Sequence, residues 1–245
     1  MIHDYRPGDV LRLECPFTET TVTEVSRYHV SVRCPWWAAD PQAEGIHWNG
    51  GRAMPLPAAR EWEIFRTEPV ETELRPGDTC RVGMPPTVVH VQSVEYYDPP
   101  MVTGLLPRPA CYVEVLRQGE VYEPDFEDQG YAFDPAGGEP ISVELLFRPY
   151  AFLEPGDEVA DRDGRAWRFD AAWDWHAFDG EASGTPVWPL VLLCRDGEPI
   201  PDGTDGTDGT EAAAAVARAT AAGSHAEEWE RWTGLALAQP AADRP

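Results

Sequence analysis

The chain has 245 residues, with 43 Asp or Glu against 19 Arg and no Lys, so its formal net charge at pH 7 is −24. Nucleic acids and anionic membranes bind proteins through clustered cations, so this charge argues against both as partners. A hydrophobic content of 42% is enough for real cores, and 25 Pro with 21 Gly favour short strands joined by turns. We therefore expect a mainly β protein.

The five cysteines predict a reducing compartment. They form no CxxC pair, and Cys15, Cys34, Cys111 and Cys194 lie among aliphatic residues, as buried reduced thiols do. The first residues have no basic and apolar leader, and no run of about 18 apolar residues occurs. These features predict a cytoplasmic protein, and Arg without Lys is typical of high-GC bacterial coding.

A Pro-Gly-Asp tripeptide occurs three times, at residues 7–9, 76–78 and 155–157. Proline fixes φ and glycine accepts φ > 0, so each tripeptide predicts a turn that starts a strand. Three such turns predict three related modules, at residues 1–70, 71–150 and 151–201.

Short strands fill the predicted modules. Leu11, Leu13 and Cys15 alternate with Arg12 and Glu14, the period of a half-buried strand. Five or six strands in about 65 residues is the size of a small bent barrel. Further candidate strands are residues 20–25, 30–34, 46–48, 52–56 and 62–65, then 87–91, 111–115, 131–133 and 141–147, and 187–194. In the third module, Asp163-Gly164 predicts a hairpin, and we expect this smaller module to pack on the second.

The C-terminal part has a different composition. Residues 202–210 repeat Asp-Gly-Thr three times, which predicts a flexible linker. Residues 211–238 predict a short helical segment, broken at Gly223, in which Ser224 to Glu227 has the form of a capping box. Residues 239–245 are expected to be a disordered tail.

The order of a Pro-Gly-Asp-led strand, a meander and a late hairpin resembles SH3-like small barrels of the Tudor and KOW kind. The resemblance covers Tyr5–Phe65 best, then Leu74–Phe147, then Leu153–Cys194. It implies two to three tandem small SH3-like barrels plus a C-terminal helix on a flexible linker. Such barrels bind peptides, nucleic acid or modified side chains and are rarely enzymes, but function depends on sites rather than on folds.

Tryptophans are the candidate binding residues. On the loops of small barrels, aromatic rings can form a cage or groove for a cation or a proline-rich peptide, although they can equally be core. Because neighbours on a strand point to opposite faces, one ring of the adjacent pair Trp36 and Trp37 should be exposed. Trp229 and Trp232, spaced by three residues on a predicted helix, could dock into a partner or cover a sheet edge of the same chain. The candidate set is Trp36, Trp37, Trp48, Trp62, Trp173, Trp175, Trp229 and Trp232.

Catalytic and metal signatures are weak. Asp174, His176 and Asp179 could orient a base or bind a metal, but no nucleophile with a recognised context accompanies them. Without Lys there is neither a Walker A lysine nor a Schiff base. Histidines 29, 47 and 90 lack partners at metal-ligand spacing, and Asp202, Asp205 and Asp208 lack the closing Glu of a calcium loop. We expect no cofactor, no metal and no catalysis.

Three functions remain open from the sequence. The first is a non-catalytic protein-binding or adaptor protein that presents aromatic grooves on tandem barrels. The second is an acidic inhibitor or immunity-type protein that neutralises a basic partner by charge complementarity. The third is an enzyme whose site is assembled between modules. The expected partner is a protein or peptide, with a basic one favoured by the charge, and the oligomeric state is left open.

Overall fold

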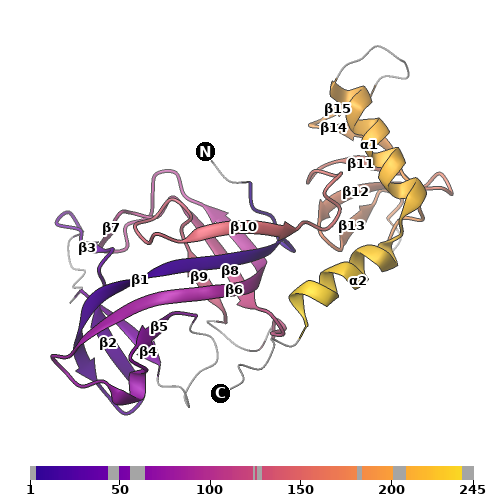
Figure 1. Cartoon of the computed structure of the whole chain (residues 1–245). Coiled ribbons are helices and arrows are strands. Elements are labelled where there is room, and N and C mark those ends of the chain that lie inside the picture. Colours follow the sequence, from indigo (N-terminus) through magenta and orange to yellow (C-terminus); the bar gives the residue numbers. More distant parts are fainter. Residues whose placement is uncertain are drawn as a thin grey trace. The chain divides into compact units, whose positions relative to one another are not determined.

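The computed structural model describes residues 4–43, 50–55, 64–123, 125, 129–180, 184–200 and 208–238, and the structural statements below concern these residues. The described chain is mainly β, as the composition predicts, and it divides into two compact units (Figure 1). Unit 1 runs to Leu146 and includes the residues from Ala236 on, and unit 2 is Phe147–Leu235. Within the described residues, no helix is both long enough and apolar enough to cross a membrane.

Unit 1 is built on two long antiparallel strands, β1 (Val10–Val25) and β6 (Thr79–Tyr96), which lie side by side in Figure 1. Its main sheet has the order β4-β2-β1-β6-β8-β9, with β10 also paired to β1 and β5 to β6, while β3 and β7 form a separate pair. The other elements are β2 (His29–Arg33), β3 (Ala38–Ala39), β4 (Gly51–Pro55), β5 (Arg66–Glu68), the 3-10 helix η1 (Glu71–Glu73), β7 (Leu105–Leu106), β8 (Cys111–Arg117), β9 (Tyr131–Phe133) and β10 (Ser142–Phe147).

The alternation expected for the first strand is confirmed. Leu11, Leu13 and Cys15 are buried, whereas Arg12 and Glu14 face solvent. The buried side chains of β1, β2, β6 and β8 meet in one hydrophobic core that also includes Met54, Phe65 and Phe133. One core therefore serves both the first and the second predicted modules.

All three Pro-Gly-Asp tripeptides form the predicted turn. Each glycine has a φ of 90° to 95°, as a type II turn requires at that position. Each aspartate makes two hydrogen bonds to the residue that precedes the proline. Its amide donates to the carbonyl of that residue, and its carboxylate accepts from the amide of that residue. The carboxylate bonds run from the amides of Arg6, Arg75 and Glu154 to Asp9, Asp78 and Asp157, at 3.0, 2.8 and 2.9 Å.

The two turns of unit 1 each bind the strand that follows the other turn. The Gly8 amide donates to the Val91 carbonyl at 2.9 Å, and the Val91 amide donates to the Asp9 carbonyl at 2.8 Å. At the far end of the β1–β6 ribbon, Gly77 and Asp78 hold Val22 with the same two bonds, both at 2.9 Å. The strand register runs from Val10 opposite His90 to Thr21 opposite Thr79, so the two ends of the ribbon are equivalent.

The rest of unit 1 follows the same approximate two-fold relation. Strands β2 and β4 extend the sheet beyond β1 in the way that β8 and β9 extend it beyond β6. The strand that ends the first half, β5, pairs with β6, and the strand that ends the second half, β10, pairs with β1. Each half of unit 1 is therefore completed by strands of the other half.

Unit 2 is a five-stranded antiparallel sheet with two helices. The sheet order is β13-β12-β11-β14-β15, and helix α1 lies against β14. Val216 and Thr220 of α1 are buried, and the Leu190 amide donates to the Thr220 hydroxyl at 2.9 Å. The elements are β11 (Glu158–Ala160), β12 (Ala166–Ala171), β13 (Asp174–Ala177), β14 (Val191–Arg195), β15 (Glu198–Pro199), α1 (Asp208–Ala222) and α2 (His225–Ala236).

The third Pro-Gly-Asp turn closes within its own hairpin. The Gly156 amide donates to the Phe169 carbonyl at 2.7 Å, and the Phe169 amide donates to the Asp157 carbonyl at 2.9 Å. Phe169 lies on β12, which β11 reaches through the turn predicted at Asp163-Gly164, where Gly164 has φ 82°. Unit 2 thus repeats the turn chemistry of unit 1 without any exchange of strands.

The structure differs from the expected division of the chain in two places. Residue 70 is not a boundary, because β1 and β6 pair along most of their length and share one core. At the C-terminal end, Asp208–Thr210, expected in the linker, form the start of α1, and the predicted helical segment consists of α1 and α2 on either side of Gly223. The break at Gly223 and the capping residue Ser224 are confirmed, since the Ser224 hydroxyl accepts from the Glu227 amide at 3.3 Å.

Candidate functional site: an aromatic cluster in unit 2

The predicted tryptophans fall into three groups. Trp48 and Trp62 lie outside the described residues. Trp36 and Trp37 lie in unit 1, on the connection after β2 and not on a strand, and both are half-buried. Trp173, Trp175, Trp229 and Trp232 lie in unit 2, where the structure brings them together.

In unit 1 the aromatic rings surround a cation of the chain itself. The Arg52 guanidinium lies over the rings of Phe65, Tyr131 and Trp37, at 4.2, 5.4 and 5.5 Å from their centroids. The Glu139 carboxylate pairs with Arg52 at 3.3 Å and accepts from the Tyr131 hydroxyl at 2.7 Å. An aromatic cage does form near Trp36 and Trp37, but Arg52 occupies it.

In unit 2 the aromatic cluster has Tyr150 at its centre. Tyr150 is fully buried, and its ring is within 5.0 to 6.4 Å, centroid to centroid, of six other rings. We define the aromatic cluster as Tyr150 with Phe152, Phe169, Trp173, Trp175, Trp188, His225, Trp229 and Trp232. Its members come from the segment before β11, from the β12–β13 hairpin, from the segment before β14 and from α2.

Polar contacts fix the centre of the cluster. The Tyr150 hydroxyl lies 2.8 Å from His225 Nδ1, and His225 Nε2 lies 2.7 Å from the Pro186 carbonyl. The Tyr150 amide donates to the Glu228 carboxylate at 3.1 Å. Burial raises the pKa of Tyr150, with Glu228 adding to the effect, and burial lowers the pKa of His225.

Trp173 connects this centre to helix α2. Its ring meets Trp229 edge-on at 5.0 Å and Trp232 at 6.2 Å, while Trp229 and Trp232 stack at 5.3 Å. Trp173 has φ 69° in the tight turn between β12 and β13, a left-handed conformation that is an outlier for a bulky side chain. Such backbone outliers cluster at functional sites and persist only where the surroundings hold them. Trp229 keeps 48% of its surface exposed.

Sequence reasoning found four members of this cluster and missed its centre. Tyr150 and Trp188 belong to no motif, His225 is a variable position of the predicted capping box, and only the fold brings residues 150, 188 and 225 into contact. The spacing of Trp229 and Trp232 by three residues correctly placed both rings on one side of a helix.

The other predicted polar groups do not converge. Asp174 and His176 are exposed on β13, and Asp179 forms a bidentate pair with Arg165, at 2.6 and 2.7 Å. Among the described residues, no group of three or more His, Cys, Asp or Glu is placed to hold a metal ion. Burial raises the pKa of the Cys15 thiol to about 12, and it also raises the pKa of Cys34 and Cys80, so these thiols stay protonated and unreactive.

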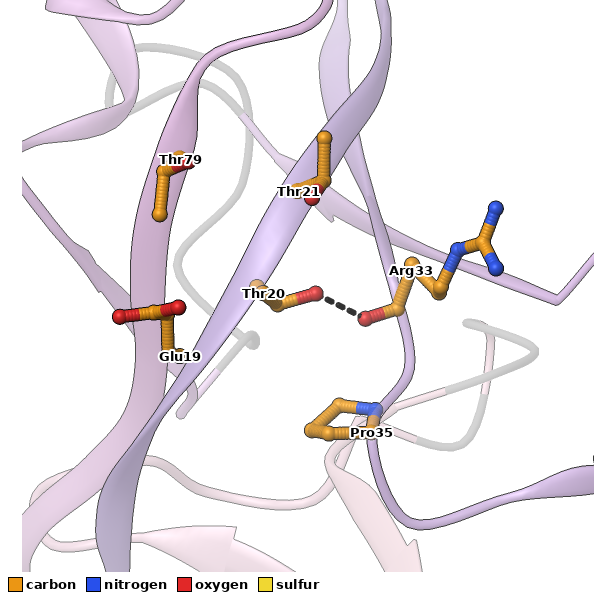
Figure 2. A pocket seen from close by; sticks show the side chains of 6 residues that line it. All are labelled: Glu19, Thr20, Thr21, Arg33, Pro35 and Thr79. Atoms are coloured by element: carbon orange, nitrogen blue, oxygen red, sulfur yellow. Dashed lines mark hydrogen bonds between the residues drawn. The ribbon is translucent and has the colours of Figure 1, made fainter.

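A shallow recess in unit 1 offers no better site. It is open to solvent and is lined by Glu19, Thr20, Thr21, Arg33, Pro35 and Thr79. Figure 2 shows the Thr20 hydroxyl directed at the Arg33 carbonyl, to which it donates. The Arg33 guanidinium extends away from Glu19, so the two charges do not converge on one ligand (Figure 2).

Comparisons of the chain with protein-family models, curated proteins and solved structures find no match. The aromatic cluster is therefore interpreted from its own geometry and chemistry.

Proposed function

We propose that the protein is a non-catalytic binding protein that uses the outer face of α2 to engage an arginine-rich segment of a basic partner. The observation that carries the proposal is the set of three mutually contacting indoles, Trp173, Trp229 and Trp232, in which Trp229 remains 48% exposed. Tryptophan anchors supported from behind by other side chains are typical of binding hot spots.

Charge on the same helix supports a basic partner. Glu227 and Glu230 are exposed on α2, two residues before and one residue after Trp229 in sequence. Guanidinium groups pair with carboxylates and also stack on indole faces, so a helix that carries both suits an arginine-rich segment. The acidic field of the whole chain, with its net charge of −24, would favour encounter with a cationic protein.

A peptide titration tests this proposal. A labelled arginine-rich peptide should bind the full chain, and Trp229→Ala should weaken binding about 2- to 30-fold, the range of a cation–π contact. Fluorescence anisotropy of the peptide measures the effect. Phe178→Ala is the matched control, because Phe178 is an aromatic residue of unit 2 that is 49% exposed and distant in sequence from α2. Equal loss in both variants, or binding that Trp229→Ala leaves intact, would contradict the proposal.

An acidic inhibitor that acts by charge alone is the second candidate. Carboxylates of the chain pair with many of its own arginines, for example Arg12 with Glu144 at 2.5 Å and Arg108 with Asp40 at 2.7 Å. Because carboxylates outnumber arginines in the chain, the surplus of negative charge would be available to a basic partner. This mode predicts an association rate that falls steeply with salt and does not depend on Trp229.

The scaffold in this proposal is a set of three related small barrels, of which two exchange strands inside unit 1. The equivalent turns, the two-fold strand order of unit 1 and the self-closed hairpin of unit 2 support this relation. Within unit 2, an SH3-like barrel of this kind would support α2.

A further inference from the structure

His225 is the first residue of α2, and both of its ring nitrogens are engaged by unit 2. The Pro186 carbonyl can only accept a hydrogen bond, so Nε2 carries the proton of that 2.7 Å contact. In the neutral ring Nδ1 is then unprotonated and accepts from the Tyr150 hydroxyl at 2.8 Å. A neutral imidazole in this one tautomer satisfies both contacts.

The surroundings of His225 are aromatic. The rings of Trp188, Tyr150 and Trp175 lie 5.0, 5.5 and 5.8 Å from the imidazole, centroid to centroid. A proton added at Nδ1 would face the Tyr150 hydroxyl proton, which must then rotate away. The resulting cation would also lie among rings that have replaced its water.

Glu228 is a charged group next to this contact; it lies one turn further along α2 and accepts from the Tyr150 amide at 3.1 Å. The segment before β11 contributes Tyr150, β13 contributes Trp175, and the segment before β14 contributes Pro186 and Trp188. None of these four side chains carries a charge near neutral pH. Arg231 extends to the Phe147 ring, 4.6 Å from its centroid, and lies 3.8 Å from Glu228.

We propose that His225 is a proton-sensitive latch: α2 is docked on unit 2 while the imidazole is neutral, and protonation releases the helix together with Trp229 and Trp232. Release would separate Trp229 from its support, Trp173, so the latch would regulate the binding surface. This regulatory role rests on the proposed function. The latch itself is a property of unit 2 and needs no partner.

The direction of the pH effect follows from linkage. Burial lowers the pKa of His225 in the docked helix, so the docked state binds fewer protons than the released state. Docking is therefore at full strength above the ordinary histidine pKa of about 6.5 and weakens as the pH falls below it. The loss ends once the pH has passed the lower pKa of the docked form.

Hydrogen exchange on the full chain, without any ligand, tests the latch. Amides of residues 225–236 should lose protection between pH 7.5 and pH 5, after correction for intrinsic exchange, whereas those of β11 and β12 should not. NMR of the His225 ring gives its pKa in the docked helix as a second measurement. For each pH unit by which this pKa lies below 6.5, the equilibrium constant for docking of α2 should fall about tenfold on acidification.

Two variants separate the latch from general acid weakening. His225→Gln removes the titrating group, so protection of α2 should be lower at pH 7.5 than in the parent chain but should no longer change toward pH 5. Tyr150→Phe removes the donor that opposes a proton on Nδ1, so the pKa of the docked His225 should rise toward 6.5 and the loss of α2 protection between pH 7.5 and pH 5 should become smaller. His90→Gln is the control, because His90 is buried in unit 1 and its pKa is also lowered by burial, yet it should leave α2 unaffected.

The latch is overturned if His225 titrates at its ordinary pKa, if α2 protection does not change with pH, or if His225→Gln keeps the acid step. Failure of the arginine-rich peptide to bind would overturn the proposed function and leave these ligand-free measurements standing.

Discussion

The two units place the same turn in opposite roles. In unit 1, the turns at Gly8 and Gly77 hold strands that follow the other turn, whereas in unit 2 the turn at Gly156 holds the next strand of its own hairpin. The local chemistry is identical in glycine φ and in both aspartate contacts. What differs is whether the chain turns back after the first short strand or continues straight through.

One position accounts for that difference. The seventh residue after the turn aspartate is Gly164 in unit 2, where φ is 82°, but it is Pro16 and Pro85 in the two halves of unit 1. Proline is locked near φ −65° and cannot adopt the glycine conformation. In unit 2, Asp161 strengthens the turn, accepting from the amides of Asp163 and Arg165 at 3.0 and 2.9 Å. In unit 1 the chain stays extended and its partner strand comes from the other half.

The largest expected effect comes from giving unit 2 the unit 1 residue. Gly164→Pro forbids the φ of 82° and removes the amide that donates to the Asp161 carbonyl at 2.9 Å. We expect a loss of more than about 3 kcal/mol in the unfolding free energy of unit 2. Tryptophan fluorescence during urea unfolding measures it, since Trp167, Trp173, Trp175, Trp188, Trp229 and Trp232 all lie in unit 2.

Gly164→Ala is the control for that substitution. A Cβ there meets nothing within 4 Å, so only the left-handed backbone penalty of about 1–2 kcal/mol applies. A proline variant no less stable than the alanine variant would disprove the role assigned to this position.

A smaller effect should distinguish the turn aspartates. Asp157 is 1% exposed and its carboxylate holds Arg195 at 2.6 and 2.9 Å, whereas Asp78 is exposed. Asp157→Ala leaves Arg195 without this partner and should cost about 3 kcal/mol. Asp78→Ala loses one exposed hydrogen bond and should cost about 1 kcal/mol. Chemical denaturation of each variant gives the order, and equal costs would mean that the turns depend on glycine alone.

A further effect within this range probes the middle of the β1–β6 ribbon. A Cβ on Gly83 would lie 2.7 Å from Phe17 Cα and 2.8 Å from the Cys15 carbonyl oxygen, so Gly83→Ala should destabilise unit 1 by about 1–3 kcal/mol. Circular dichroism during urea unfolding measures the change. Gly234→Ala in α2 is the control, because it meets nothing within 4 Å and should be neutral or stabilising. If Gly83→Ala were equally harmless, the close approach of the strands would not matter.

Local features of the fold could be predicted from the sequence, and the strand partners could not. The type II turns, the alternation in β1, the hairpin at Gly164 and the cap at Ser224 depend on neighbouring residues, and each is confirmed. The alternation of apolar and polar residues does not distinguish a strand that pairs with its own hairpin from one that pairs with a distant strand of the same pattern. The prolines at positions 16 and 85 carry that information, but only comparison with Gly164 in the structure reveals it.

The candidate site shows the same limit. The residue type alone pointed to four members of the cluster, Trp173, Trp175, Trp229 and Trp232. Tyr150 and His225 contact each other across about 75 residues of chain, and no sequence periodicity reaches that far. For Trp36 and Trp37 a cage was expected, and the cation inside it, Arg52, could not be assigned because neither its partner Glu139 nor Tyr131 is near it in sequence.

The crossed turns of unit 1 have a consequence for synthesis on the ribosome. When only the first half has emerged, Gly8 and Asp9 have nothing to hold, because Val91 has not yet been translated. The nascent first half must therefore wait, with its apolar strand faces uncovered, until the second half follows it out of the exit tunnel. The β11–β12 hairpin of unit 2, whose turn bonds only to Phe169 of the same hairpin, can close as soon as that strand has been translated.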